Sequence, residues 1–402
     1  MRRVKLGQIC EVVSGGTPKT NVEEYWNGEF NWITPAEIND NDYIISDTKR
    51  KITQLAIEKK KLTLLPKGTV LLSSRAPIGK VAIAGKEMYC NQGFKNLICS
   101  DEICNEYLYW YLKSKKEYLN SLGRGATFKE ISKKIVENIE IKLPEIEQQR
   151  KIVNKLKEVD KIIQQRKCQS RLLDGMVQAR FVEMFGDPII NNRGWRESTI
   201  GEDCFVTKLA GFEYSKYIKY DNVGDVVMVK AQNVKNGTLN RKDLSFISNE
   251  VSDALPRSQL LPGDVVMTYV GANIGDVALI DDKYKYHLAP NVAKIRVDDK
   301  VYNPVYFMYM LMFLNSYIVK NSADTAKAAL GMERIRKLKV FIPTYDLQNQ
   351  FATFVHQVNK SKFVIHKFLY CTTHNTKSII KPRPNTKESG KIRGGKPHAD
   401  EF

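Results

Sequence analysis

The sequence predicts an α+β protein with two similar domains separated by two long antiparallel helices that pair as a coiled coil. Three observations lead to this prediction: a helical stretch of about 40 residues in mid-chain, a second amphipathic stretch near the end, and motifs that recur after 196 to 199 residues. The 402 residues, 43% of them hydrophobic, suffice for two domains with separate cores. The chain is therefore a tandem repeat, and we expect pseudo-two-fold symmetry.

Residues 144–187 are predicted to form the long central helix. From Glu145 to Phe185 the chain contains no proline and one glycine, and apolar residues recur at steps of three and four, with Arg166, Ser170 and Arg180 interrupting the same seam. A helix of roughly 38 residues is about 57 Å long, so it needs a partner helix rather than a place inside one small domain. The residues of the apolar seam are Ile152, Leu156, Val159, Ile163, Leu173, Val177 and Met184.

Residues 343–380 are predicted to form the partner helix. Phe351, Val355, Val358, Ile365 and Leu369 lie on one stripe. The composition after Tyr370, rich in Thr and Asn and then in Gly and Pro, does not favour a helix, so we expect a shortened partner. Residues 381–402 are predicted to be a disordered basic tail.

The first domain is predicted at residues 1–143. Short β-rich runs such as Thr69–Leu72 and Val81–Ala84 are bounded by Pro and Gly, which is typical of strands joined by exposed turns. A helical run at Tyr107–Leu112 follows. A last strand, Ile139–Leu143, ends at Pro144.

The second domain is predicted at residues 188–342, because it repeats the motifs of the first in the same order. Leu261–Ile280 repeats the Leu-Pro turn with its nearby glycine and the Ile-Gly-x-Val-Ala run 196 residues after their first copy. Asn291–Lys294 is expected to take the place of Asn91–Lys95. The apolar run Val305–Leu314 takes the place of Tyr107–Leu112; at about ten residues it is half the length of a membrane span, so we expect a buried helix and no membrane partner.

The net charge of +18 and the pI near 9.4 indicate a polyanionic partner, with nucleic acid ahead of ribosomal or anionic-membrane binding. Seven cysteines without a CxxC pair predict reduced thiols of a cytoplasmic protein and no zinc site. The start of the chain lacks the apolar segment of a secretion signal.

Two similar domains on a pair of helices suit a bipartite site on double-stranded DNA, whose half-sites need not be identical. Contact requires polar side chains that reach base edges and cations that reach phosphates. For any one residue, an ordinary solvated turn remains an equal alternative. The first-domain candidates are Ser74, Arg75, Lys80, Asn91, Gln92, Lys95, Arg124, Thr127 and Lys129. The second-domain candidates are Lys230, Gln232, Asn233, Tyr269, Asn273, Asn291, Lys294, Lys327 and Arg334.

No catalytic or metal-binding residue is predicted. The turn at Ser74–Val81 lacks the first Gly and the Ser/Thr of a phosphate-binding loop. Asn303-Pro-Val-Tyr306 is similar to the Asn-Pro-Pro-Tyr of adenine methyltransferases, but no cofactor fingerprint precedes it and a helix start explains its proline. The acidic pair Asp281 and Asp282 beside Lys283 is interpreted as a solvated turn.

Five features together resemble the specificity subunits of type I restriction–modification systems. They are the repeated Leu-Pro turns with a nearby glycine, the repeated Ile-Gly-x-Val-Ala runs, the helix exit Phe181–Pro188, and the Gln-rich helix starts after Pro144 and after Pro343. The resemblance covers roughly residues 1–370. It implies two target-recognition domains that each read half of an interrupted DNA site, and helices that fix the spacing. It also implies two methyltransferase subunits and two restriction/translocase subunits as partners, in host defence.

The same resemblance implies a non-catalytic chain with no cofactor of its own, since S-adenosylmethionine, ATP and Mg²⁺ belong to the partner subunits. Two other hypotheses stay open. One is a catalytic nucleic-acid enzyme such as an adenine methyltransferase. The other is a silent allele, suggested by the altered segment after Tyr370, which would leave the second helix about a third too short.

Overall fold

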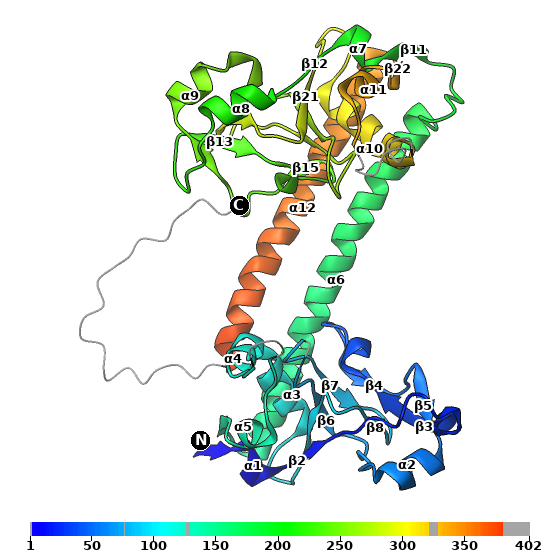
Figure 1. Cartoon of the computed structure of the whole chain (residues 1–402), viewed down its shortest axis with the longest axis vertical. Coiled ribbons are helices and arrows are strands. Elements are labelled where there is room, and N and C mark those ends of the chain that lie inside the picture. The colour runs from blue at the N-terminus through cyan, green and yellow to red at the C-terminus, as the bar shows by residue number, and fades with distance from the viewer. Residues whose placement is uncertain (1, 76, 126–128, 321–328, 381–402) are drawn as a thin grey trace, which may run out of the picture. The chain divides into compact units, whose positions relative to one another are not determined.

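The computed structural model describes residues 2–75, 77–125, 129–320 and 329–380, with the backbone alone for 373–380. It consists of two compact units (Figure 1): unit 1 is Met1–Lys167 with Lys367–Phe402, and unit 2 is Cys168–His366. Two long helices, α6 (Ile146–Phe185) and α12 (Tyr345–Ile380), contribute residues to both units. The predicted tail at residues 381–402 lies outside the described residues.

Unit 1 is an α+β domain. Its elements before α6 are β1 (Arg2–Lys5), α1 (Leu6–Ile9), β2 (Cys10–Ser14), η1 (Glu23–Tyr25), β3 (Trp26–Ile33), η2 (Pro35–Glu37), β4 (Ile44–Ile45), β5 (Arg50–Ile52), α2 (Gln54–Lys60), β6 (Val70–Leu72), β7 (Val81–Ala84), β8 (Tyr89–Cys90), β9 (Lys95–Cys99), α3 (Asn105–Ser114), α4 (Lys116–Ser121), α5 (Lys133–Glu137) and β10 (Glu140–Leu143). One sheet has the order β2-β9-β6-β7-β4, a second has the order β5-β3-β8, and β1 pairs with β10. The first and last strands of the domain are therefore neighbours.

Unit 2 repeats this plan between α6 and α12. Its elements are β11 (Arg196–Thr199), α7 (Ile200–Asp203), β12 (Cys204–Lys208), α8 (Gly211–Tyr217), β13 (Val226–Val229), η3 (Ala231–Asn233), β14 (Val234–Lys235), β15 (Thr238–Leu239), β16 (Phe246–Ile247), α9 (Asn249–Asp253), η4 (Pro256–Ser258), β17 (Gln259–Leu260), β18 (Val265–Thr268), β19 (Val277–Leu279), β20 (Lys285–Leu288), β21 (Val292–Val297), α10 (Pro304–Lys320), α11 (Met332–Arg336) and β22 (Lys339–Ile342). Its sheets have the orders β12-β21-β18-β19 and β16-β13-β20-β17, and β11 pairs with β22.

The strand pairings confirm the repeat. The run β2-β9-β6-β7 corresponds to β12-β21-β18-β19, and the parallel pair of β3 with β8 corresponds to that of β13 with β20. The closing pairs β1·β10 and β11·β22 are both antiparallel. The chain therefore contains two α+β domains of one topology.

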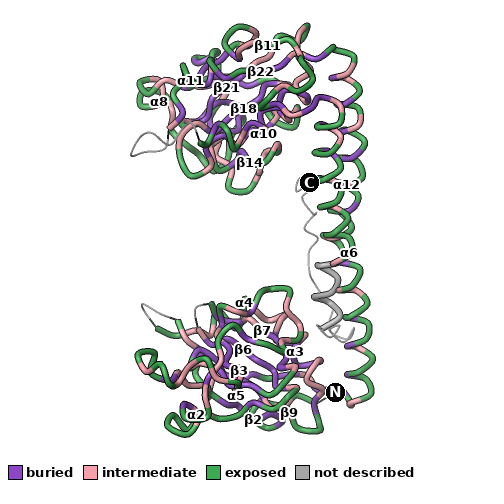
Figure 2. The backbone as a smooth tube through the Cα atoms, turned by 90° about the vertical axis from the view of Figure 1, so that its right-hand side faces the viewer, coloured by how far each residue is buried: buried purple, intermediate pink, exposed green. Residues whose placement is uncertain are grey.

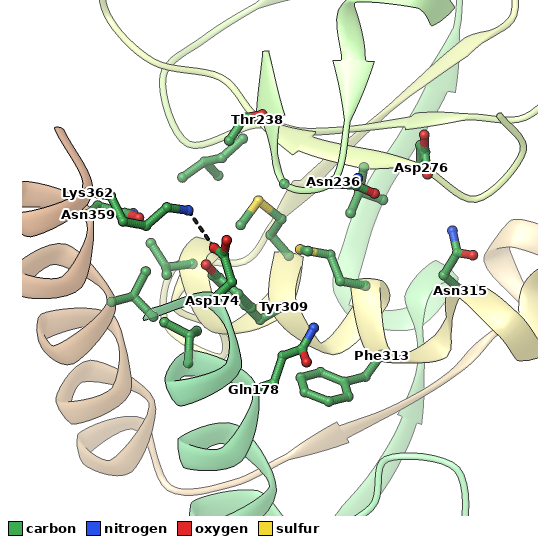
Figure 3. A pocket seen from close by; sticks show the side chains of 18 of the residues that line it. Asp174, Gln178, Asn236, Thr238, Asp276, Tyr309, Phe313, Asn315, Asn359 and Lys362 are labelled. Carbon is green, nitrogen blue, oxygen red and sulfur yellow. Dashed lines mark hydrogen bonds and ion pairs between the residues drawn. The ribbon is translucent and has the colours of Figure 1, made fainter. Parts of the chain in front are cut away.

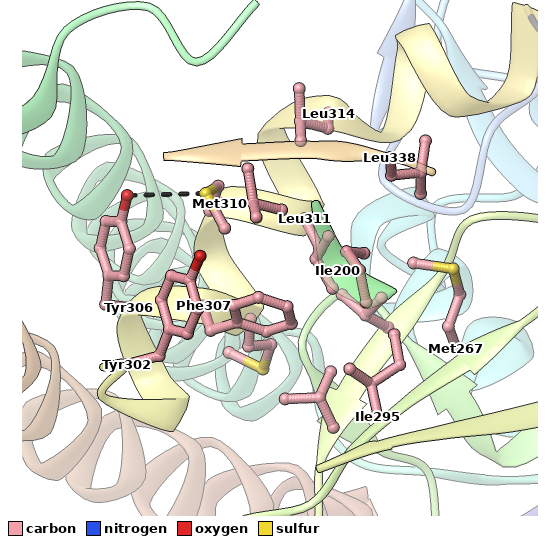
Figure 4. Close-up of a cluster of buried hydrophobic side chains, with 14 of the residues drawn as sticks. Ile200, Met267, Ile295, Tyr302, Tyr306, Phe307, Met310, Leu311, Leu314 and Leu338 are labelled. Atoms are coloured by element: carbon pink, nitrogen blue, oxygen red, sulfur yellow. Dashed lines mark hydrogen bonds between the residues drawn. The ribbon is translucent and has the colours of Figure 1, made fainter. Parts of the chain in front are cut away.

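Each unit has its own core (Figure 2). In unit 2 the apolar run of the sequence forms α10, which is buried against the sheet as predicted, and Figure 4 shows its Tyr306, Phe307, Met310 and Leu311 in the cluster. The Tyr306 hydroxyl donates to the carbonyl of Phe341 at 3.1 Å. Among the described helices, none has both the length and the apolar content needed to cross a bilayer.

A buried glutamine near the start of each long helix joins that helix to the domain before it. The Gln149 amide donates to the carbonyls of Glu102 (3.0 Å) and Pro144 (2.9 Å) and accepts from the Cys104 amide (2.8 Å). Gln348 makes the same three bonds 199 residues later, to Val301 (3.0 Å), Pro343 (3.0 Å) and Asn303 (2.8 Å). Both side chains are fully buried.

The second long helix corrects one expectation. α12 has 36 residues against 40 in α6, so it continues ten residues past Tyr370 and is not a third shorter. Thr and Asn are weak helix formers, but each costs only about 0.7 kcal/mol or less relative to Ala, whereas Gly and Pro cost more. No Gly or Pro follows Pro343 until Pro382, so nothing breaks the helix before its end.

Within unit 2 the two long helices run antiparallel. Phe181 lies against Phe351, with ring centroids 5.4 Å apart, and Lys362 donates to Asp174 at 2.5 Å (Figure 3). Buried Val153, Phe181 and Phe185 belong to the apolar face of α6, although the predicted seam omitted them. Aromatic residues at the end of α6 pack on α10 as well as on α12, so the helix period alone does not place them.

Lys294, on β21, is almost fully buried. Its ammonium donates to the carbonyls of Arg257 (2.7 Å) and Gln259 (2.8 Å). Burial is the main cause that lowers the pKa of Lys294 to about 8, and the neighbouring Arg296 lowers it further.

The glutamine anchors predict a position-specific loss of stability. Gln149→Ala leaves the part-buried Cys104 amide and Glu102 carbonyl and the buried Pro144 carbonyl without this partner, so the unfolding free energy should fall by about 2–4 kcal/mol. Neighbouring Gln148 is exposed, so Gln148→Ala should change the unfolding free energy by less than about 0.5 kcal/mol. Urea unfolding of the full chain measures both; equal effects would contradict the anchor role.

The lowered pKa of Lys294 leads us to expect that the stability of the fold depends on pH. Between pH 8 and the ordinary lysine pKa of 10.5, the unfolded chain binds more protons at this position than the folded chain, so folding becomes more favourable as the pH rises. Relative to Lys294→Met, the wild type should gain on the order of 3 kcal/mol across this window. Unfolding at about pH 7.5 and about pH 10 measures the gain, with exposed Lys300→Met as the control; a constant difference contradicts the lowered pKa.

Candidate nucleic-acid interface

In unit 1 the three predicted contact segments meet at one place. The amide of Ser74 donates to the carbonyl of Gly93 at 2.8 Å, and the amide of Ile131 donates to the carbonyl of Ser74 at 3.0 Å. Glu130 forms isolated antiparallel bridges with both Arg75 and Arg124. Backbone pairing therefore brings Ser74 and Arg75, Gly93, and the residues Arg124, Glu130 and Ile131 side by side.

The candidate side chains of unit 1 differ in exposure. Gln92, Arg124 and Lys129 are exposed, while Arg75, Lys80 and Asn91 are half-buried. The Lys80 ammonium donates to the carbonyl of Pro35 at 2.9 Å, the Asn91 side-chain oxygen accepts from the Gly93 amide at 2.8 Å, and Gln92 contacts Thr17. Thr127 lies outside the described residues.

Ser74 and Lys95 of the same set are buried. The Ser74 hydroxyl has no partner among the described residues, and the Lys95 ammonium lies 3.1 Å from a carboxylate oxygen of Glu130. These two side chains belong to the interior, so we remove them from the set expected to touch DNA.

In unit 2 the segment Lys230–Asn233 is also divided between surface and interior. Gln232 is exposed, and Lys230 donates to the Ser245 hydroxyl at 2.8 Å. Asn233 is 2% exposed and donates to the carbonyl of Asn240 at 2.9 Å. It stabilises its own loop and does not present an amide to solvent.

Tyr269, Asn273 and Asn291 lie where unit 1 has its convergent segments. The Tyr269 amide donates to the carbonyl of Asn291 at 3.0 Å, and Asn273 accepts from the Asp276 amide at 3.1 Å. The Lys208 ammonium lies 5.4 Å from the Tyr269 ring centre. Lys208 is an exposed cation that the motif comparison missed, because it lies on β12, far from the repeated turns in sequence. Arg334 is exposed, and Lys327 lies outside the described residues.

Strand pairing corrects the equivalence of Asn91–Lys95 with Asn291–Lys294. The Ser74 amide donates to the carbonyl of Gly93, and in the second domain the equivalent Tyr269 amide donates to the carbonyl of Asn291. Asn291 therefore matches Gly93 and not Asn91. Lys294 then matches Asn96, one position past Lys95. Because neighbouring residues of a strand face opposite sides, Lys294 and Lys95 point to opposite faces of equivalent sheets.

The motifs considered for catalysis have structural roles. The Asn303 side-chain oxygen accepts from the Val305 amide at 2.9 Å, which caps α10 and confirms the helix-start interpretation. Asp281 is not a solvated turn residue, since it accepts from the Tyr286 hydroxyl at 2.7 Å and contacts Arg241. Across residues 2–75, 77–125, 129–320 and 329–380 no group of three potential metal ligands occurs.

A cavity of about 760 Å³ lies in unit 2 between α6, α10, α12 and the turn at Asn236–Gly237 (Figure 3). The Asp174–Lys362 ion pair lies at its wall, together with Asn315 and Asp276. Burial raises the pKa of Asp276. The lining combines methionine and aromatic side chains with amides, and it contains none of the predicted DNA-contact residues.

Comparison with known proteins identifies the family. A family model described as the type I restriction modification DNA specificity domain matches residues 1–170 and 192–369. The chain is 30% identical to the type I restriction enzyme MjaIX specificity subunit of Methanocaldococcus jannaschii over 371 residues, 87% of this chain and 85% of that protein.

Two solved structures share the fold. One, from work on complex assembly and conformational transition of a type I restriction–modification system, has a TM-score of 0.60 at 18% identity and covers 94% of this chain and 96% of its own. The other, the S subunit from M. genitalium, has a TM-score of 0.53 at 15% identity over 94% and 95%. The chain therefore belongs to the family of type I restriction–modification DNA specificity subunits.

Proposed function

We propose that each domain of this specificity subunit reads one half of an interrupted site on double-stranded DNA. The observation that supports this proposal most directly is that the segment that carries Arg124 and Lys129 pairs with the turn that carries Arg75 in unit 1. Half-buried Arg75 has its backbone fixed by pairing, and exposed Arg124 and Lys129 supply cations for phosphates or guanine edges. In unit 2 the corresponding set is Gln232, Tyr269, Asn273, Asn291 and Lys208.

We place the recognition domains at residues 1–143 and 188–342, and the long helices at 144–187 and 343–380. The helices would form a coiled coil that fixes the spacing of the half-sites. Inside unit 2, the aromatic contact of Phe181 with Phe351 and the ion pair of Asp174 with Lys362 support such a pairing. The relatives are specificity subunits, and no cluster of metal ligands lies in the part of the chain that the structure describes. The kinship with specificity subunits supports a chain without chemistry of its own.

The chemistry would then come from partner subunits in the cytoplasm. We propose two methyltransferase subunits, which use S-adenosylmethionine, and two ATP- and Mg²⁺-dependent restriction subunits. The exposed faces of the long helices carry apolar residues suited to docking, among them Leu172, Met176, Phe363 and Val364. The full length of α12 supports a competent allele rather than a silent one.

The DNA assignment predicts a change in one half-site. Coexpressed with its methyltransferase subunit in a methylation-free host, the chain should direct adenine methylation to one interrupted motif. Arg75→Ala with Lys129→Ala should abolish methylation or relax one half of that motif, because phosphate and base contacts are lost together. Genome-wide methylation sequencing measures this. Lys59→Ala with Lys60→Ala on α2 makes the same charge change at exposed positions and should leave the motif intact.

The proposed partners predict the stoichiometry of the complex. The purified complex of this chain with the methyltransferase subunit should contain two copies of that subunit per chain, as measured by native mass spectrometry. Truncation after Tyr370 removes the last ten residues of α12 and should weaken the second copy more than the first. A stable one-to-one complex of the intact chain contradicts the proposed stoichiometry.

A further inference from the structure

Glu130 is an acidic residue at the centre of a surface that we propose to bind a polyanion. Its carboxylate, 40% exposed, lies 3.1 Å from the ammonium of Lys95, whose side chain is 10% exposed. A carboxylate on a surface that binds DNA repels the phosphates of the DNA. Its presence here therefore calls for a structural reason. The Lys95 ammonium neutralises that charge from inside the domain.

The backbone of Glu130 joins the contact segments to one another. Its amide donates to the carbonyl of Arg124 at 2.9 Å, and its carbonyl accepts from the Arg124 amide at 3.0 Å. On its other side Glu130 bridges Arg75, and the next residue, Ile131, donates to Ser74. Lys95 lies at the start of β9, so the ion pair ties the loop that carries Arg124 to the sheet.

The second domain offers an internal comparison, because it has the same backbone pairings without the ion pair. Val270 bridges Ala329 as Arg75 bridges Glu130, and Leu330 donates to Tyr269 as Ile131 donates to Ser74. Ala329 therefore occupies the place of Glu130.

The position of Lys95 is also occupied by alanine in the second domain. Phe94, which precedes Lys95, bridges Ser73, and Val292 pairs with Thr268 in the same manner. The residue after Val292 is Ala293, which therefore occupies the place of Lys95. Both members of the pair are alanine in the second domain, so the fold does not require the ion pair.

We propose that the ion pair of Lys95 and Glu130 is a positioning pair for the first DNA half-site: it holds the backbone at Arg75 and Arg124 in the geometry that discriminates bases. This inference rests on the proposed function of the surface. Neither side chain needs to touch DNA. Because direct readout depends on donors placed to hydrogen-bond accuracy, even a small shift of this backbone relative to the sheet lowers discrimination before it lowers phosphate attraction.

The decisive variant removes both partners at once, Lys95→Ala with Glu130→Ala, because it reproduces the arrangement already present in the second domain and leaves no buried charge unpaired. The complex with the methyltransferase subunit is assayed on DNA duplexes with single-base changes in either half-site. The half-site of the first domain is the one altered by Arg75→Ala with Lys129→Ala. Discrimination is the rate of methylation of the correct duplex divided by the rate for each changed duplex.

We expect discrimination at the first half-site to fall about tenfold while the second half-site is unchanged. The matched control is Glu106→Gln with Lys157→Met, which removes an ion pair of 2.5 Å between α3 and α6 in the same unit and should leave both half-sites unchanged. Melting temperatures of both variants separate lost stability from lost discrimination.

Unchanged discrimination at the first half-site, or an equal loss at both half-sites, overturns the positioning role. If the double variant does not yield a folded complex, Glu130→Gln keeps an oxygen acceptor for Lys95 and should relax the same half-site by a smaller factor; an unchanged value there overturns the role equally. A wild-type complex that methylates no interrupted motif contradicts the proposed function instead.

Discussion

Each domain of this chain depends on one buried amide. Gln149 and Gln348 lie in the first turn of a long helix and bond three backbone groups that the preceding domain leaves open. A buried backbone group without a partner costs about 1–3 kcal/mol, so the helix start cannot move away from the domain cheaply. The start of a helix of 36 or 40 residues is therefore held to its domain within the first turn.

Much of the fold could be predicted from the sequence, and the reason is periodicity. The apolar stripes of α6 and α12 and the duplicated turns gave the two helices, the buried α10 and the repeat. The expectation that α12 is about a third too short was wrong, because the weak helix formers after Tyr370, such as Thr372, were treated as if they ended a helix as proline does. Val153 and Phe185 were missed because they pack within the domains and not along a simple seam.

The candidate site was harder to predict than the fold. Motif spacing located the right turns, but it could not separate exposed Arg124 from buried Lys95, or exposed Gln232 from buried Asn233, since the spacing of a motif does not tell which side chains of a loop or a short helical turn face the interior. Glu130 was not selected at all. Its role follows from the bridges to Arg75 and Arg124, which join positions 55 residues apart on one side and six on the other, and no local pattern reveals them.

The pairing of β1 with β10, and of β11 with β22, has a consequence for how such a protein can vary. In both domains the chain enters and leaves on adjacent antiparallel strands, so both junctions lie at one place on the surface. A whole domain can then be exchanged by two crossovers in the gene while the helices and their glutamine anchors stay as they are. New sequence specificities would be acquired by replacing a cassette, without redesign of the assembly that uses them.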